Sequence, residues 1–172
     1  MAFMSPKKLN IFIWRLHLNK IPTLSNLADR GVIVNNDQCI FFQSVIEDID
    51  HLFTTCCYTT PLWRSFNNWW GLNNETPSGV NNVISGRNFQ IGSDALKLMC
   101  LTSIYVLLWS IWKWRNKVVH SPAQWRSVIL NEDILVSEKL LAHLWISNRK
   151  KRWSISLEEW KQDPGASRLV EE

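Results

Sequence analysis

Cys39, His51 and Cys56 lie close together in the sequence and carry side chains that bind transition metals. Zinc prefers thiolate and imidazole ligands, which proteins supply as close pairs around a short loop. Phe42 stands where a C-x-x-C pair would have its second thiolate, so the frame of a C-x2-C-x8-H-x4-C knuckle remains with one ligand missing. His51 and Cys56 are five residues apart, on one face of a helix or around a turn. We therefore predict a zinc site with an incomplete ligand set.

The missing ligand leaves several arrangements open. A phenyl ring cannot coordinate a metal, and the lost thiolate removes a large part of a binding energy of about 10–16 kcal/mol for complete structural sites. Cys57, Glu47, Asp50 or a water molecule could supply the fourth ligand. Three protein ligands plus water is also the arrangement of catalytic zinc. Nothing else in the sequence supports catalysis, so we interpret the frame as a structural site that has decayed.

The sequence lacks the motifs of several common classes of enzyme. It has no Tyr/Phe-x-Asp-Asp pair of carboxylates, which a polymerase needs to hold two metal ions. It also has no P-loop, no G-x-S-x-G motif and no carboxylate set resembling a ribonuclease H or an endonuclease. We therefore expect a protein that is not an enzyme by itself.

Helices must position this loop, and apolar spacing and caps predict where they lie. Leu9, Phe12, Ile13 and Leu16 recur at helical spacing after Ser5-Pro6. The predicted elements of the first half are a helix from Pro6 to Ile21-Pro22, a short helix over 23–30 ended by Gly31, a brief strand over 32–34, and a helix from Thr60-Pro61 to Gly71.

The second half of the chain should be helical as well. Ser93 is a good cap for a long helix through Lys117. Another helix starts at Ser121-Pro122, with a broad apolar face that includes Val136, Leu140 and Leu144. The predicted fold is mainly α: short helices around a Cys/His zinc-knuckle-like loop, a flexible linker, and a pair of long helices. The predicted divisions are 6–70 (zinc-binding-like), 71–92 (linker), 93–162 (helical) and 163–172 (disordered tail).

Several motifs together resemble the zinc-binding domain of plant LINE-type (non-LTR) retrotransposon reverse transcriptases. They are the run Pro6–Arg15, then Ile21-Pro22-Thr23, Leu27, Arg30-Gly31, and the stretch from Cys39 through His51-Leu52-Phe53 and Cys56 to Trp63. The similarity spans roughly residues 6–70. Further on, Leu108–Asn116 is similar to the I-W-K-x-R-N segment that often follows this domain in the same elements.

The resemblance implies Cys39, His51 and Cys56 as zinc ligands, with the family's second cysteine replaced by Phe42. It implies RNA or DNA as a partner, together with a reverse transcriptase polymerase domain. That polymerase domain lies upstream in the parent polyprotein and is absent from this chain, so the family's polymerase activity would reside there.

Basic residues around the first helix are the candidate nucleic-acid contacts. Lys7, Lys8, Arg15 and Lys20 come with no acidic residue among them, and the chain has a net charge of +4 and a pI near 9.0. They could follow a phosphate backbone, and a solvated helix face is an equally good interpretation. The eleven tryptophans predict a core filled with indole rings rather than base-stacking platforms.

Two classes of function remain. The first is a non-catalytic, RNA-binding accessory module derived from a retrotransposon reverse transcriptase, with a degenerate zinc site. The second is a non-functional retroelement relic, or a helical protein-interaction module without metal. The start at Met1, just before the match to an internal domain, and the broken ligand set favour a relic.

The sequence also predicts where the protein works. We see no secretory signal, and the four cysteines lack the dense spacing of a disulfide scaffold, so we expect an intracellular protein, nuclear or cytoplasmic. The uncharged run Leu98–Trp112 is only about 22 Å long as a helix, short of a hydrocarbon core of about 30 Å. We therefore expect no membrane span.

Overall fold

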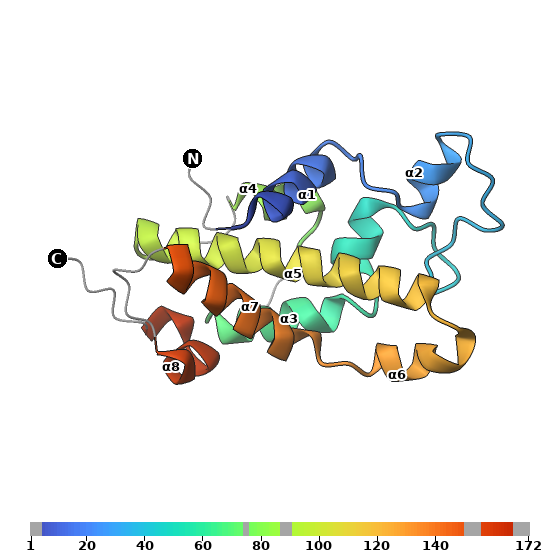
Figure 1. The fold of residues 1–172 in the computed structure, drawn as a ribbon. Helices are drawn as coiled ribbons and strands as arrows, with labels where there is room; N and C mark the ends of the chain where they lie inside the picture. Colours follow the sequence, from blue (N-terminus) through green and yellow to red (C-terminus); the bar gives the residue numbers. More distant parts are fainter. Residues whose placement is uncertain (1–4, 74–75, 87–90, 150–155, 167–172) are drawn as a thin grey trace.

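The computed structural model describes residues 5–73, 76–86, 91–149 and 156–166 (Figure 1). Its elements in chain order are α1 (Lys7–His17), α2 (Leu24–Ala28), η1 (His51–Thr55), α3 (Thr60–Trp69), α4 (Val80–Ser85), α5 (Asp94–His120), η2 (Ala123–Trp125), α6 (Arg126–Leu130), α7 (Ile134–Arg149), α8 (Leu157–Gln162) and η3 (Pro164–Ala166). The described residues contain helices and no strand, which confirms the predicted mainly α fold.

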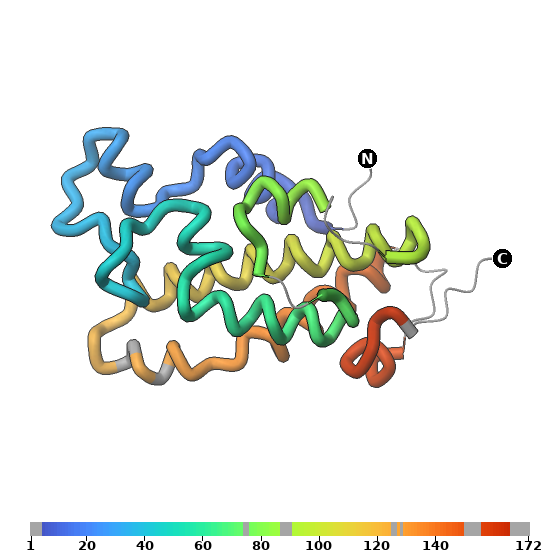
Figure 2. The backbone as a smooth tube through the Cα atoms, turned by 180° about the vertical axis from the view of Figure 1, so that it is seen from behind, coloured from blue at the N-terminus to red at the C-terminus, as the bar shows by residue number. Residues whose placement is uncertain are grey.

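The long helix α5 runs through the middle of the molecule, and the other helices pack around it (Figures 1 and 2). α1, α4, α6 and α7 contact α5 directly, whereas α3 and α8 pack against α7. Buried side chains lie on all sides of α5. A helix that is apolar all around is expected in the core of a fold, and the packing of α5 gives that apolar surface its partners.

Local capping fixes where α5 begins. The Ser93 side chain accepts a hydrogen bond from the Leu96 N–H at 3.2 Å, as the sequence predicts. Among the described residues, α5 is the one helix that is both long enough and apolar enough to cross a membrane. However, 67% of its most apolar window is buried inside the fold. Buried core helices of soluble proteins pass the same test, so this helix is weak support for a membrane span.

The turn after α1 is held by one buried side chain. Asn19 has a positive φ of 51° and ends the helix. The Asn26 amide donates hydrogen bonds to the Asn19 and Ile21 carbonyl oxygens. The predicted short helix follows as α2, capped by Thr23. Consequently the basic face of α1 is fixed relative to the segment that leads into the cysteine loop.

The helix predicted after Ser121-Pro122 is divided in the structure. Asp133 accepts hydrogen bonds from the Leu135 and Val136 N–H groups, so a new helix, α7, begins there. The apolar residues predicted to share a face do so on α7, but this face lies at the surface. Val136, Leu140 and Leu144 are exposed, and the buried residues of α7 are Ile134, Glu138, Ala142 and Ile146.

The predicted strand over 32–34 is also wrong, since these residues form no strand and Ile33 is 96% exposed. Helix α4 lies within residues 71–92, for which the sequence predicts a linker. Its Val80 and Val83 are buried against the shared core, and Asp50 accepts a hydrogen bond from the Val80 N–H. Of the predicted tail 163–172, residues 164–166 form η3, and residues 167–172 lie outside the described part of the chain.

Buried tryptophans join segments that are distant in sequence, as the prediction of an indole-filled core requires. Four of them donate their N–H group to a backbone carbonyl oxygen: Trp63 to Phe53, Trp69 to Trp160, Trp114 to Ile129, and Trp160 to Lys139. Each ring thus buries a large apolar area while its one polar atom stays hydrogen-bonded. The core is continuous from α1 to α8.

Candidate metal centre

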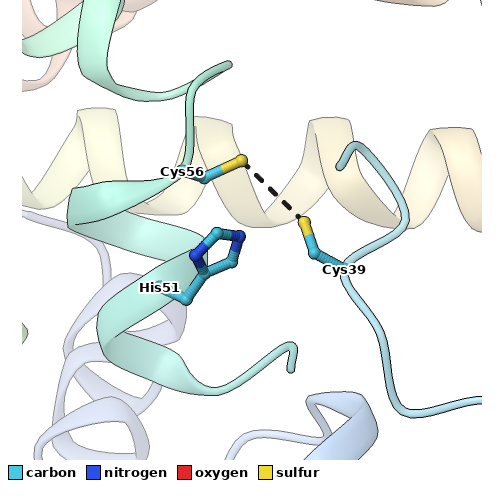
Figure 3. A group of neighbouring side chains, drawn as sticks. All are labelled: Cys39, His51 and Cys56. Atoms are coloured by element: carbon cyan, nitrogen blue, oxygen red, sulfur yellow. Dashed lines mark hydrogen bonds between the residues drawn. The ribbon is translucent and has the colours of Figure 1, made fainter. Parts of the chain in front are cut away.

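Cys39, His51 and Cys56 come together at one buried point beside α5 (Figure 3). Their ligand atoms all lie within 4.8 Å of one another, and the two sulfur atoms are 3.8 Å apart. Both cysteines are free thiols. The sequence spacing predicted that these three residues lie together, and in the structure their side chains form one cluster.

A tight hairpin-like loop positions Cys39. Its ends are closed by hydrogen bonds from the Glu47 N–H to the Asp37 carbonyl at 2.8 Å and from the Cys39 N–H to the Val45 carbonyl at 2.7 Å. A single antiparallel bridge joins Gln38 and Ile46. The loop turns the Cys39 side chain inward, whereas Phe42, at its tip, is 48% exposed.

The π-helical turn η1 positions His51 and Cys56. The Cys56 N–H donates to the His51 carbonyl at 2.8 Å, and this i to i+5 bond brings the two residues to the same side of the turn. The Asp48 carboxylate accepts a hydrogen bond from the His51 N–H and fixes the start of the turn. Leu52 and Phe53, fully buried, anchor it in the core.

The hydrogen bond between the two thiols favours the thiolate form of one of them. The hydrogen bond from Cys56, helped by the N–H groups of Phe42 and Phe41 and by the side chain of His51, lowers the pKa of Cys39 to about 5 against the opposing effect of burial. The same contact, together with burial, raises the pKa of Cys56. Because the thiolate is the form that binds metals, Cys39 is a ready ligand.

The geometry of the cluster fits zinc. Two thiolates about 2.3 Å from a tetrahedral zinc ion lie about 3.8 Å apart, which matches the separation of the Cys39 and Cys56 sulfur atoms. A disulfide would need about 2.05 Å. The Nε2 atom of His51 is buried and has no hydrogen-bond partner. A borderline metal ion would satisfy both the sulfur pair and this nitrogen.

The other residues considered as a fourth ligand do not join the cluster. Cys57 is exposed. Both oxygens of Glu47 bind Arg115, and one also accepts the Leu24 N–H. The Asp50 carboxylate accepts the Val80 N–H of α4. Among the described residues the group therefore has three candidate protein ligands. Of the four candidates for the fourth ligand, only a water molecule remains.

Sequence reasoning missed the ion pair that attaches this centre to α5. Arg115 binds Glu47 at 2.6 and 3.2 Å, and both side chains are almost completely buried. Phe41, from the cysteine loop, stacks on Trp114 with ring centroids 4.5 Å apart. Arg115 and Trp114, which make these contacts, both belong to the I-W-K-x-R-N-like segment of α5. That segment was the sequence signal from which these contacts could have been found.

The predicted nucleic-acid contacts are solvent-accessible. Lys7, Lys8 and Arg15 lie on the exposed side of α1, and Lys20 is exposed in the turn that follows. None of the ion pairs found in the described part of the chain uses them. They form a basic surface that is distinct from the buried metal ligands.

Residues 2–63 match the family described as zinc-binding in reverse transcriptase. The matched segment contains all three members of the cluster and the whole of α1. No match was found among curated proteins or among solved structures. The first third of this chain is accordingly similar to the zinc-binding domain of reverse transcriptases.

Proposed function

Starting from this reverse-transcriptase zinc-binding segment, we propose that the protein is a non-catalytic accessory module that holds zinc through Cys39, His51 and Cys56 and binds RNA. Zinc would supply structure rather than chemistry, by tying the cysteine loop to η1. The partner nucleic acid would contact Lys7, Lys8, Arg15 and Lys20. The intracellular location expected from the sequence, nuclear or cytoplasmic, is part of the same proposal.

One observation supports zinc above the others: two buried free thiols 3.8 Å apart with a buried imidazole whose Nε2 has no partner. Buried polar atoms are nearly always hydrogen-bonded, so an unmet nitrogen beside two sulfur atoms favours a metal there. A structural role fits because η1 and the cysteine loop are otherwise joined through few backbone hydrogen bonds.

Charge supports the nucleic-acid part of the proposal. Cations without acidic partners release counterions when they bind phosphates, and this release provides most of the affinity of sequence-independent binding. Exposed Lys and Arg on one helix of a zinc-binding reverse-transcriptase segment are well placed for that role.

The first experiment measures metal content of the purified protein by inductively coupled plasma mass spectrometry, with Cys39→Ser and Phe42→Cys as matched variants. We expect about one zinc per chain in the wild type and none in Cys39→Ser, because a site with two remaining ligands loses most of its affinity.

Two other outcomes would change the assignment. A wild-type protein without zinc, beside a Phe42→Cys variant that loads it and unfolds at a higher temperature, would identify a decayed frame and favour a relic. If neither protein retains zinc, the ligand assignment is wrong.

One observation favours the second candidate, a protein-interaction module. Val136, Leu140 and Leu144 form an exposed apolar line along α7 at i, i+4 and i+8. Such a line is typical of a helix that packs against another protein. Analytical ultracentrifugation of the wild type and of Leu140→Lys would detect self-association through it.

A further inference from the structure

Helix α1 exposes an aromatic side chain at the centre of an apolar line. Ile11, Trp14 and Leu18 follow one another at i, i+3 and i+7 and are all exposed, with Trp14 at 61%. This exposure sets Trp14 apart, because Trp63, Trp69, Trp70, Trp114 and Trp160 are buried in the core. Most of one indole face is therefore available to a partner.

Positive charge is concentrated on the same helix and its following turn. Residues 1–28 contain Lys7, Lys8, Arg15 and Lys20 and no Asp or Glu, so this segment alone accounts for the net charge of +4, and residues 29–172 are balanced. Lys8 and Arg15 are seven residues apart on α1, about 10 Å along its axis. Both lie on the same side of the line that contains Trp14.

The positive potential extends from α1 to the neighbouring helix α5. Burial and the nearby charge of Lys8 lower the pKa of Lys113. Since Lys8 has no acidic partner within salt-bridge distance among the described residues, its field reaches the surface around α1 unneutralised. An anion bound there would meet cations from two helices.

We infer that this face of α1 binds single-stranded nucleic acid, with Trp14 stacking on an unpaired base while Lys8 and Arg15 contact the flanking phosphates. The inference rests on the proposed nucleic-acid function and adds the residue that selects unpaired strands. An aromatic side chain inside a basic surface is the usual platform for such strands. In a duplex the bases stay stacked inside the helix, out of reach of the indole.

A protein partner fits this face less well. Charged residues, and lysine in particular, are depleted at the centres of protein–protein interfaces, whereas Lys7 and Arg15 adjoin the Trp14 line directly on the helix. The combination of indole and cations therefore favours a strand with bases and phosphates.

The test is fluorescence anisotropy with a labelled uridine homopolymer of about a dozen nucleotides, a length that covers one such site. Trp14→Ala should weaken binding about 5- to 100-fold, which corresponds to the loss of one stacked base. Trp14→Phe should restore most of the affinity, because the phenyl ring still stacks. The Trp14→Ala change should have little effect on the affinity for a duplex RNA. Ile33→Ala, an exposed apolar truncation in the loop after α2, is the matched control and should leave all affinities unchanged.

The charge contribution is measured separately. Replacing both Lys7 and Lys8 by alanine should reduce the slope of log affinity against log salt by about 1.4, or 0.7 per phosphate contact of a single strand. Repeating the Trp14→Ala titration with a thymidine homopolymer distinguishes an RNA strand from a DNA strand as the ligand, and a loss of affinity with either supports the stacking. Circular dichroism should show unchanged folding, because Trp14 lies outside the core.

The failures of the two proposals look different. If Trp14→Ala binds as tightly as the wild type while the double lysine variant binds more weakly, charge alone holds the strand and the stacking inference is overturned. If Trp14→Ala instead changes only the association state of the protein, this face is a protein interface, which also overturns it. If the wild type binds no oligonucleotide at low salt, the proposed nucleic-acid function itself fails.

Discussion

Glu138 is completely buried between α7 and α5, and neither of its carboxylate oxygens has a hydrogen-bond partner. Burial raises its pKa well above the ordinary value, and the charge of Lys139 opposes the change only in part. The same carboxylate, with burial, raises the pKa of Cys100 on α5. A charge at this point would be costly, so the folded protein favours the protonated form.

This residue makes stability fall as the pH rises. In the unfolded chain Glu138 ionises near pH 4.3, whereas the folded protein keeps the proton to a higher pH. Its favourable contribution is complete below the unfolded pKa and is lost as the pH increases through the folded pKa. Glu138→Leu should therefore raise the urea midpoint more at pH 8 than at pH 5, with a gain of about 1–3 kcal/mol at the higher pH. Glu158→Gln, an exposed carboxylate on α8, is the control and should change neither midpoint.

At the residue scale, the sequence was sufficient for the three clustered side chains and insufficient for their surroundings. The interval between His51 and Cys56 predicted a shared face, which the i to i+5 turn of η1 provides. The burial of Glu138 and the exposure of Trp14 were not predictable, because apolar spacing does not say which side of an element meets the core. Only packing partners from distant parts of the chain decide that.

At the scale of elements, the cysteine loop is attached to α5 by one buried ion pair. Glu47 receives two hydrogen bonds from Arg115, and the guanidinium also lies 5.2 Å from the centre of the Trp112 ring. In the sequence, Glu47 lies between the loop that carries Cys39 and the turn that carries His51. The ion pair therefore fixes both parts of the metal centre to the central helix.

Removing one member of this pair should be much worse than removing both. Arg115→Met should lower the free energy of unfolding by about 3–5 kcal/mol, because it leaves a buried carboxylate without its partner. Glu47→Gln combined with Arg115→Met should cost less than the sum of the two single changes, since no uncompensated charge remains. Urea unfolding of the four proteins measures this coupling.

Lys117→Ala provides the comparison for that cycle. Lys117 pairs with Glu132 at the surface, so its removal should cost about 1 kcal/mol or less. Additive costs for the Glu47 and Arg115 changes would contradict the coupling and would mean that the loop is held by packing alone.

Caps predicted the helices better than apolar patterns did. Ser93 starts α5 as expected, because a side-chain oxygen at a helix start acts locally, and Thr23 caps α2 in the same way. The prediction of a single helix after Ser121-Pro122 was wrong because of another local cap. Asp133 caps a new helix, α7, within the predicted range. The apolar line on α7 lies at the surface, a placement that the sequence leaves open because apolar spacing does not distinguish an interior face from an unpaired one.

At the scale of the whole molecule, the core continues past the end of the family match at residue 63. Aromatic residues of the matched segment pack on α5: Phe12 on Trp109 with centroids 5.0 Å apart, and Phe41 on Trp114 at 4.5 Å. Trp69 of α3 donates a hydrogen bond to the Trp160 carbonyl of α8. The composition of residues 71–92 suggested a boundary, but composition carries no information about these long-range contacts.

The predicted division at residues 71–92 can be tested with a fragment of residues 1–73, in zinc-containing buffer. This fragment keeps the cysteine loop, η1 and α1, but it loses Trp109 and Trp114 and the Arg115 partner of Glu47. It would expose the apolar faces of Phe12 and Phe41 and leave Glu47 without its partner, costs that exceed the usual margin of stability of a small domain. We expect the fragment to show no cooperative thermal transition by circular dichroism, whereas residues 1–166 unfold in one transition. A sharp transition in the fragment would instead establish residues 6–70 as an independent domain, held by zinc and by its own short helices.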